Sequence, residues 1–188
     1  MISRGYLKAV NVDFTKIDPH ARSEYPYNLN FIRSLANLKL HRSVTYFVGE
    51  NGVGKSTLLE AIAIASGFNP EGGTRNFNFS TRASHSDLYA ALKISRGIDS
   101  LKDGFFLRSE SFFNLASEIE KLDNEGGAGG RIIDSYGGRS LHDQSHGESF
   151  WALFMERFYG NGLYILDEPE AALSPTRQMA ALVRMDEL

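Results

Sequence analysis

The segment best suited to chemistry is Gly49-Glu50-Asn51-Gly52-Val53-Gly54-Lys55-Ser56-Thr57. Its glycines let backbone N–H groups surround phosphates, and a helix that starts directly after it adds partial positive charge. Lys55 would reach the β- and γ-phosphates, and the Ser56 hydroxyl is a hard oxygen ligand that suits Mg²⁺. The segment fills the pattern G-x-x-x-x-G-K-[ST], so we predict that its nine residues bind ATP with Mg²⁺. The alternative is a glycine turn that binds no nucleotide.

A second candidate is the pair of carboxylates that follows the apolar run Leu163–Leu166. A buried strand there would place Asp167 at the carboxyl edge of a sheet, where ligands of α/β folds bind. We expect Asp167 to hold Mg²⁺ and Glu168 to accept a proton from an attacking water. Taken alone, such a pair usually marks only the end of a strand. The interpretation as a hydrolytic metal site depends on its combination with the glycine-rich segment.

A third candidate is the polar turn Gln144-Ser145-His146-Gly147-Glu148, which opens an apolar stretch. The turn is also consistent with an ordinary helix start, in which Ser145 is the N-cap and an acidic residue lies in the first turn.

The elements that must position these residues follow from hydrophobic periodicity and from breakers. Strand, glycine-rich loop and helix come first, a long insertion follows, and helix and strand return, which predicts an α/β layered fold with a parallel sheet. We expect strands over 10–14, 43–48, 104–108 and 163–166, a strand or short helix over 87–95, helices over 55–67, 112–122 and 149–159, a flexible loop over 124–130, and a last helix capped by Ser174 and Pro175.

Composition excludes several classes of protein. The 188 residues are 42% hydrophobic and 23% charged, which is ordinary for a globular domain. A net charge of −3 argues against a protein that coats nucleic acid by bulk charge, although residues 74–108 carry a local excess of basic side chains. The chain has no cysteine, which excludes disulfides and thiolate chemistry. We see neither a signal peptide nor a transmembrane segment, and we expect a cytoplasmic protein.

The segment from Asp167 to Pro175, DEPEAALSP, resembles the Walker B and D-loop segment of ABC-type ATPases. It is most similar to small bacterial stand-alone AAA-family ATPases that are related to the SMC and recombination-repair ATPases. The stretches 67–74, 106–113 and 144–150 resemble that branch too, so the likeness covers most of the chain from about residue 30.

The resemblance implies a P-loop NTPase fold with ABC-type layers. It implies a mostly parallel sheet, N-terminal antiparallel strands and a small helical subdomain. We expect one ABC-type ATPase domain over 1–188, made of N-terminal strands and P-loop (1–67), an insertion with the helical subdomain (68–148), and the Walker B and D-loop part (149–188). A further strand that ends in a Thr-His-Ser switch would follow Leu188, so we expect this chain to bind nucleotide but to hydrolyse it poorly.

In ABC-type ATPases two subunits pack head to tail, and a signature turn of one caps the γ-phosphate held by the other. By resemblance, Ser145 would donate to that phosphate and Gly147 would bring a backbone N–H close to it. Gln144, His146 and Glu148 depart from the usual Leu, Gly and Gln. Residues 172–174 would be the D-loop that contacts the opposite subunit.

Two further assignments follow from the resemblance. Glu110 lies where these ATPases place a Gln-containing loop, although no Gln is present there. Tyr25 or Tyr27 would stack on adenine, unless both are ordinary core or surface aromatics.

The predicted function is an ATP-dependent dimerising switch. Its expected partners are a second copy of the chain, and nucleic acid or an effector protein, in nucleic-acid maintenance or defence. The alternatives are the ATPase subunit of a transporter and a nucleotide-dependent interaction module that does not hydrolyse ATP.

Overall fold

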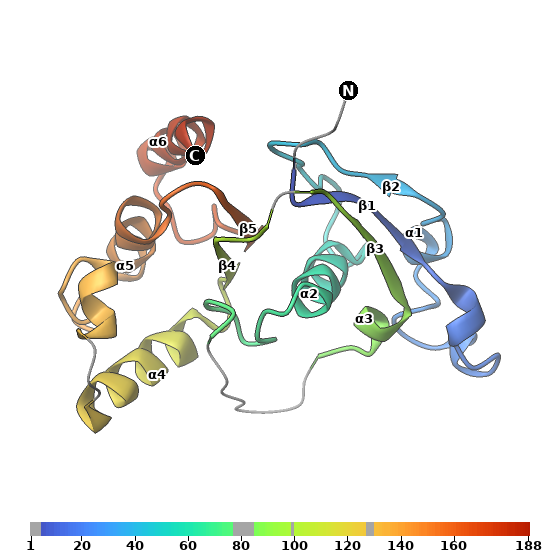
Figure 1. Ribbon diagram of the computed structural model, residues 1–188, viewed down its shortest axis with the longest axis horizontal. Helices are drawn as coiled ribbons and strands as arrows, with labels where there is room; N and C mark the ends of the chain where they lie inside the picture. The colour runs from blue at the N-terminus through green and yellow to red at the C-terminus, as the bar shows by residue number, and fades with distance from the viewer. Residues whose placement is uncertain (1–4, 77–84, 99, 127–129) are drawn as a thin grey trace. The chain divides into compact units, whose positions relative to one another are not determined.

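The computed structural model describes residues 5–76, 85–98, 100–126 and 130–188 (Figure 1). The chain divides into two compact units. The first unit comprises residues 1–70 and 82–101, and the second comprises 71–81 and 102–188. Both contain helices and strands, so the expected mixed α/β character is confirmed.

The first unit is built on an antiparallel sheet of order β2-β1-β3. The central strand β1 (Leu7–Val12) pairs with β2 (Leu38–Lys39) on one side and with β3 (Leu92–Arg96) on the other. Val10 of β1 is fully buried, as expected for the core face of an alternating strand. The predicted N-terminal antiparallel strands are therefore present, and the segment 87–95 contains both of the structures considered for it, a short helix followed by β3.

One long helix, α2 (Lys55–Ala65), accompanies this sheet. Leu58, Ala61 and Ile62 recur at helical spacing and are buried, which explains why the apolar pattern after the glycine-rich loop forms a helix. Gly67 follows in the left-handed region with φ of 93°, the conformation that commonly ends helices. The short elements of this unit are η1 (Phe14–Lys16), η2 (Ala21–Ser23), α1 (Asn30–Arg33) and α3 (Leu88–Ala91).

The expectation of a buried strand over 43–48 is wrong. No strand is present there, and the side chains of Tyr46 and Val48 are 63% and 93% exposed. β-branched and aromatic residues favour a strand only when a neighbour completes its hydrogen-bond ladder. Within the described ranges no strand pairs with this segment. The expected mostly parallel sheet is correspondingly reduced to a single parallel pair among the described residues.

That pair forms the second unit's sheet. Strands β4 (Asp103–Arg108) and β5 (Gly162–Asp167) are parallel, and the register runs from Asp103 opposite Gly162 to Arg108 opposite Asp167. Both strands were predicted from their apolar runs. The helical elements of this unit are α4 (Phe112–Glu125), η3 (Ile132–Tyr136), α5 (His146–Ala152), η4 (Leu153–Arg157) and α6 (Pro175–Glu187).

The predicted helices of the second unit are present with shifted bounds. The stretch expected as one helix over 149–159 starts earlier, at His146, and changes into a π-helical turn at Leu153. The last helix starts as predicted, with Ser174 as N-cap and Pro175 in the first turn. Helix α4 extends into the expected flexible loop over 124–130, of which residues 127–129 lie outside the described part.

The core of the second unit is rich in aromatic side chains. Phe105, Phe150 and Phe154 are completely buried, and rings from the strands and helices pack edge to face or at a tilt. This core joins the β4–β5 sheet to α4 and α5, and it thereby supports both the end of β5 and the start of α5. The buried members are Phe105, Leu107, Phe112, Leu115, Ala116, Ile119, Ile133, Tyr136, Leu141, Phe150, Leu153, Phe154, Phe158, Leu173 and Ala181.

An ion pair ties β4 to the turn η4. The Arg157 guanidinium donates two hydrogen bonds to the Asp103 carboxylate, at 3.1 and 2.9 Å, and the Tyr164 hydroxyl donates a third at 2.7 Å. Burial acts to raise the pKa of Asp103, but the hydrogen bonds from Arg157 and Tyr164 outweigh it and hold that pKa below its usual value. The pair fixes the amino end of β4. Asp167 lies on β5, at the opposite, carboxyl edge of this sheet.

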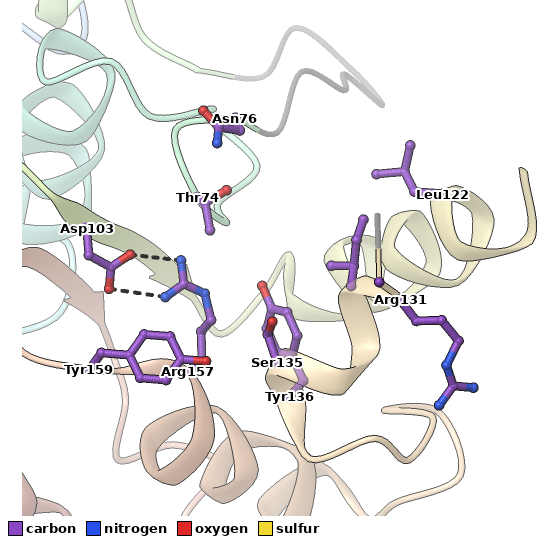
Figure 2. A pocket seen from close by; sticks show the side chains of 11 residues that line it. Thr74, Asn76, Asp103, Leu122, Arg131, Ser135, Tyr136, Arg157 and Tyr159 are labelled. Atoms are coloured by element: carbon purple, nitrogen blue, oxygen red, sulfur yellow. Dashed lines mark hydrogen bonds and ion pairs between the residues drawn. The ribbon is translucent and has the colours of Figure 1, made fainter. Parts of the chain in front are cut away.

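The same ion pair lines a cavity of about 560 Å³ within the second unit (Figure 2). The Arg157 guanidinium lies 5.9 Å from the centre of the Phe105 ring and 5.6 Å from that of Tyr159, within the range of cation–π attraction. The lining residues are Thr74, Asn76, Asp103, Leu122, Gly130, Arg131, Ile132, Ser135, Tyr136, Arg157 and Tyr159.

We predict that Asp103→Asn destabilises the protein by about 1–3 kcal/mol near pH 7, because it leaves Arg157, whose side chain is only 11% exposed, without its counter-ion. This is less than for a fully buried pair, since the Asp103 side chain is 20% exposed. The lowered pKa stabilises the fold above the unfolded value of 3.8, and this contribution is lost as the pH falls further. Urea unfolding at pH 7 and pH 3 should therefore show a difference from wild type that shrinks in acid. Asp134→Asn, which removes an exposed pair with Arg131, is the control. A difference that is independent of pH would contradict the prediction.

Candidate nucleotide-binding site

The glycine-rich loop of the first unit ends in a conformation that only glycine adopts easily. Gly54 is the N-cap of α2 and has φ of 103°. The positive φ disfavours any residue with a side chain, and a Cβ atom at this position would also lie 2.8 Å from Cδ1 of Leu29, which would have to move. Because glycine has no side-chain acceptor, it does not cap the N–H groups of the first helical turn. That turn therefore has the partial positive charge and the donors that bind anions at helix N-termini.

Lys55 folds back over this loop. Its ammonium group donates to the carbonyl oxygens of Gly49 and Glu50, both at 2.7 Å. These contacts use two of the three donors of the ammonium and hold the charge against the loop backbone. The first residue of α2 therefore brings its positive charge to the loop that the sequence predicts to surround phosphates.

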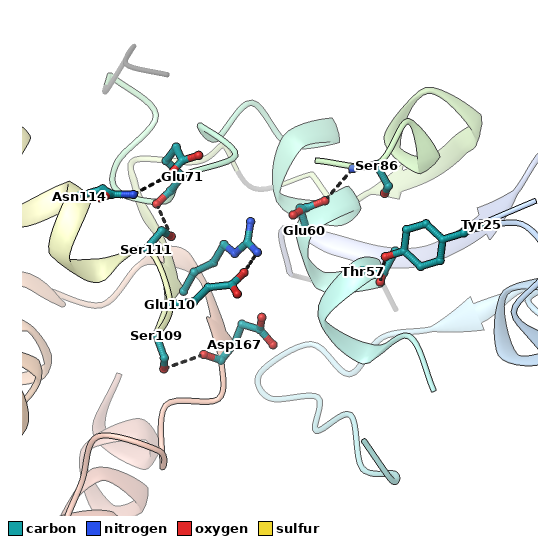
Figure 3. Close-up of polar contacts among 11 residues, drawn as sticks. Tyr25, Thr57, Glu60, Glu71, Ser86, Ser109, Glu110, Ser111, Asn114 and Asp167 are labelled. Atoms are coloured by element: carbon teal, nitrogen blue, oxygen red, sulfur yellow. Dashed lines mark hydrogen bonds and ion pairs between the residues drawn. The ribbon is translucent and has the colours of Figure 1, made fainter. Parts of the chain in front are cut away.

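The two tyrosines considered for adenine stacking lie in different environments. Tyr27 is 4% exposed, and its pKa is raised by burial and by a hydrogen bond with Asp87. Its ring belongs to the core, which is one of the alternatives that the sequence left open for it. Tyr25 is 62% exposed, and its hydroxyl lies 2.8 Å from that of Thr57 in the first turn of α2 (Figure 3). The sequence did not predict this contact, since 32 positions separate its partners.

In the second unit, the strand β5 ends as predicted. Asp167 is its last residue and is buried, whereas Glu168 is exposed and has φ of 52°. The Ser109 hydroxyl lies 3.2 Å from the carbonyl oxygen of Asp167 (Figure 3). It lies 2.8 Å from the carbonyl oxygen of Glu168. Glu110 is ion-paired with Arg108 at the end of β4. The backbone carbonyls of Asp167 and Glu168, at the carboxyl edge of the parallel pair, thus accept a hydrogen bond from the residue that follows the neighbouring strand β4.

The polar turn at Ser145 forms the N-terminus of α5. Both the backbone N–H and the hydroxyl of Ser145 donate to the Glu148 carboxylate, at 3.0 and 2.6 Å. These two hydrogen bonds lower the pKa of Glu148. The arrangement matches the ordinary helix start that the sequence also allowed, and Ser145 remains exposed.

Gly147 has a packing role that sequence reasoning missed. A Cβ atom there would come within 2.8 Å of the carbonyl oxygen of Ala172, so the first turn of α5 touches the backbone of the predicted D-loop. A glycine between two polar residues was the only sequence signal for this contact.

A protein-family model described as AAA domain matches residues 28–135, more than half of the chain. The chain belongs to the AAA domain family. AAA domains are generally nucleotide-binding ATPases and usually use Mg²⁺. The matched range includes the glycine-rich loop, Lys55 and Ser109, and it ends before Ser145 and Asp167. No curated protein and no solved structure matches the chain. In the part of this AAA domain that the structure describes, no helix is long and apolar enough to cross a membrane.

The predicted site residues of the AAA domain fall into two sets. Residues 49–57 belong to the first unit, and Ser145, Gly147, Asp167 and Glu168 belong to the second. Among the described residues, no group of three or more His, Cys, Asp or Glu could hold a metal ion. Mg²⁺ in nucleotide sites needs no such cluster, because phosphates and waters supply most of its ligands. The hydroxyl of Ser56 and the carboxylate of Asp167 are oxygen donors of the kind that Mg²⁺ takes.

We predict that Gly147→Ala lowers stability by about 1–3 kcal/mol, because the added methyl forces α5 away from the carbonyl of Ala172. Helix propensity alone would favour alanine, so a loss of stability isolates the packing effect. Gly130→Ala is the matched control, since a Cβ there meets nothing within 4 Å. Urea unfolding of the two variants measures the difference. If Gly147→Ala is as stable as wild type, the close contact is not a constraint.

Proposed function

We propose that this AAA domain is an ABC-type ATPase that binds ATP with Mg²⁺, dimerises around it and separates after hydrolysis. The observation that carries the proposal is the loop of the first unit. A left-handed Gly54 begins α2, and the ammonium of Lys55 lies against the carbonyls of Gly49 and Glu50. Uncapped amides and a held positive charge form a site for a polyphosphate.

In this proposal the loop over 49–57 binds the phosphates. Lys55 exchanges its loop carbonyls for oxygens of the β- and γ-phosphates, which gives stronger, charge-assisted hydrogen bonds. Tyr25 stacks on the base, since its exposed ring is held beside α2 by Thr57. Ser56 and Asp167 are the proposed Mg²⁺ ligands, as the sequence patterns predict. The bound Mg²⁺ would supply positive charge that offsets the negative charge developing on the phosphate oxygens.

Glu168 is the proposed general base. It accepts a proton from the water that attacks the γ-phosphate, and its position directly after the buried end of β5 supports this role. Its carboxylate is exposed and therefore reachable by water. Lys55 stabilises the negative charge that moves onto the phosphate oxygens in the transition state.

The second copy of the chain would complete the site with Ser145 and Gly147. Ser145 is exposed, so its hydroxyl can exchange the Glu148 carboxylate for a phosphate oxygen of the other copy. The N-terminus of α5 would add the N–H groups and dipole that favour an anion, although Glu148 must then turn away from it.

The partner beyond the dimer is proposed to be nucleic acid or an effector protein. The basic segment 74–108 supports nucleic acid only weakly, because several of its charges are engaged within the chain. Lys93 pairs with Asp13 and Arg108 pairs with Glu110. A role in nucleic-acid maintenance or defence therefore rests mainly on the family resemblance. Salt-dependent DNA binding would separate it from the transporter alternative, and measured ATP turnover would separate both from a module that does not hydrolyse ATP.

We predict that a Glu168→Gln variant forms a dimer in ATP and Mg²⁺, because the loss of the base traps the bound triphosphate. Size-exclusion chromatography with light scattering, with and without ATP, measures this. Adding Ser145→Ala to the same variant should remove most of the dimer while nucleotide binding by the loop remains. A protein that stays monomeric while nucleotide is demonstrably bound would contradict the composite site.

A further inference from the structure

Ser109 lies directly after the end of strand β4. It is next to Asp167 and Glu168 at the end of β5, two residues that we call the acidic turn. The register ends with Arg108 opposite Asp167, so Ser109 follows β4 at the same edge of the sheet at which Glu168 follows β5. The Ser109 hydroxyl lies 3.2 Å from the carbonyl oxygen of Asp167 and 2.8 Å from that of Glu168. A hydroxyl has one proton, which is therefore shared between two carbonyls, with the closer contact to Glu168.

Glu168 has an unfavourable backbone conformation, which needs stabilising contacts from other residues. Its φ of 52° lies in the left-handed region, which costs a residue with a side chain about 1–3 kcal/mol. Its carbonyl also accepts from the N–H of Ala171 at 3.1 Å. Two donors therefore stabilise the carbonyl that follows the strained φ, and one of them is a side chain from the neighbouring strand.

We infer that Ser109 is a positioning residue for Glu168, an inference that rests on the proposed role of Glu168 as the base. The direction of the Glu168 side chain is set by its φ and ψ. If the left-handed turn relaxes to a negative φ, the carboxylate leaves the direction in which it meets the attacking water. Displacements of about 1 Å at a reacting group cost large factors in rate, so a hydroxyl that fixes this turn affects turnover without touching nucleotide.

Ser111 offers a matched control. Its hydroxyl also donates to a backbone carbonyl, that of Glu71 at 2.8 Å, and it lies two residues from Ser109 on the same connection (Figure 3). The Ser111 bond has no link to the acidic turn. Each serine-to-alanine substitution thus removes a hydrogen bond from a hydroxyl to a backbone carbonyl. Ser109→Ala removes it at the acidic turn, and Ser111→Ala removes it at Glu71.

The kinetic test compares wild type, Ser109→Ala, Ser109→Thr and Ser111→Ala in steady-state ATP hydrolysis and in ATP binding. Ser109→Ala should lower kcat by about 10–100-fold while the Kd for ATP changes by less than about twofold. Ser109→Thr keeps the hydroxyl and should recover most of the rate, and Ser111→Ala should remain close to wild type. An active wild type with an equally active Ser109→Ala variant would overturn the inference.

A second measurement tests the role of Ser109 without relying on turnover. A wild type that shows no turnover would count against the proposed hydrolysis, and this second measurement would still test whether Ser109 holds the turn. Amide hydrogen exchange at Ala171 reports the hydrogen bond to the Glu168 carbonyl. It should speed up by about fivefold or more in Ser109→Ala, the factor expected for one lost hydrogen bond, and stay unchanged in Ser111→Ala. Unchanged protection of Ala171 in Ser109→Ala would show that the hydroxyl does not hold the turn.

Discussion

The proposed chemistry depends on one backbone constraint, the left-handed residue that joins the glycine-rich loop to α2. Gly54 lets the chain turn directly from loop to helix, and Leu29 fills the space that a side chain would need. The turn leaves the first amides of α2 uncapped and brings the ammonium of Lys55 back onto the loop carbonyls. An anion that enters the loop would replace these internal carbonyls as the partner of the lysine, so the site is organised before any ligand arrives.

A comparable constraint organises the acidic end of β5. Asp167 closes a buried strand, whereas Glu168 takes a left-handed conformation that Ser109 stabilises from the adjacent strand. In both units a residue with positive φ lies at the junction between a regular element and a loop that carries chemistry. The regular element fixes the position of such a junction, and the residue with positive φ sets the direction of the chain that follows.

Local signals in the sequence predicted much of this arrangement. The helix after the glycine-rich loop, the strands β4 and β5 and the Ser174–Pro175 helix start are set by neighbours in the sequence, and all are present. The segment 43–48 failed because a strand depends on a partner that local composition cannot specify. The contacts of Tyr25 with Thr57, Ser109 with Glu168 and Gly147 with Ala172 join residues 25 to 59 positions apart, and no periodicity encodes them.

The most direct test of the central claim is the affinity of the chain for ATP with Mg²⁺, measured by titration calorimetry for wild type and for Lys55→Ala. The account predicts binding by wild type and a loss of about 100-fold in the variant, because charge-assisted hydrogen bonds to phosphate are removed. Lys121→Ala, which removes an equal charge paired with Glu118 on the surface of the second unit, should bind like wild type. Equal affinity of wild type and Lys55→Ala would contradict the claim that this loop holds the triphosphate.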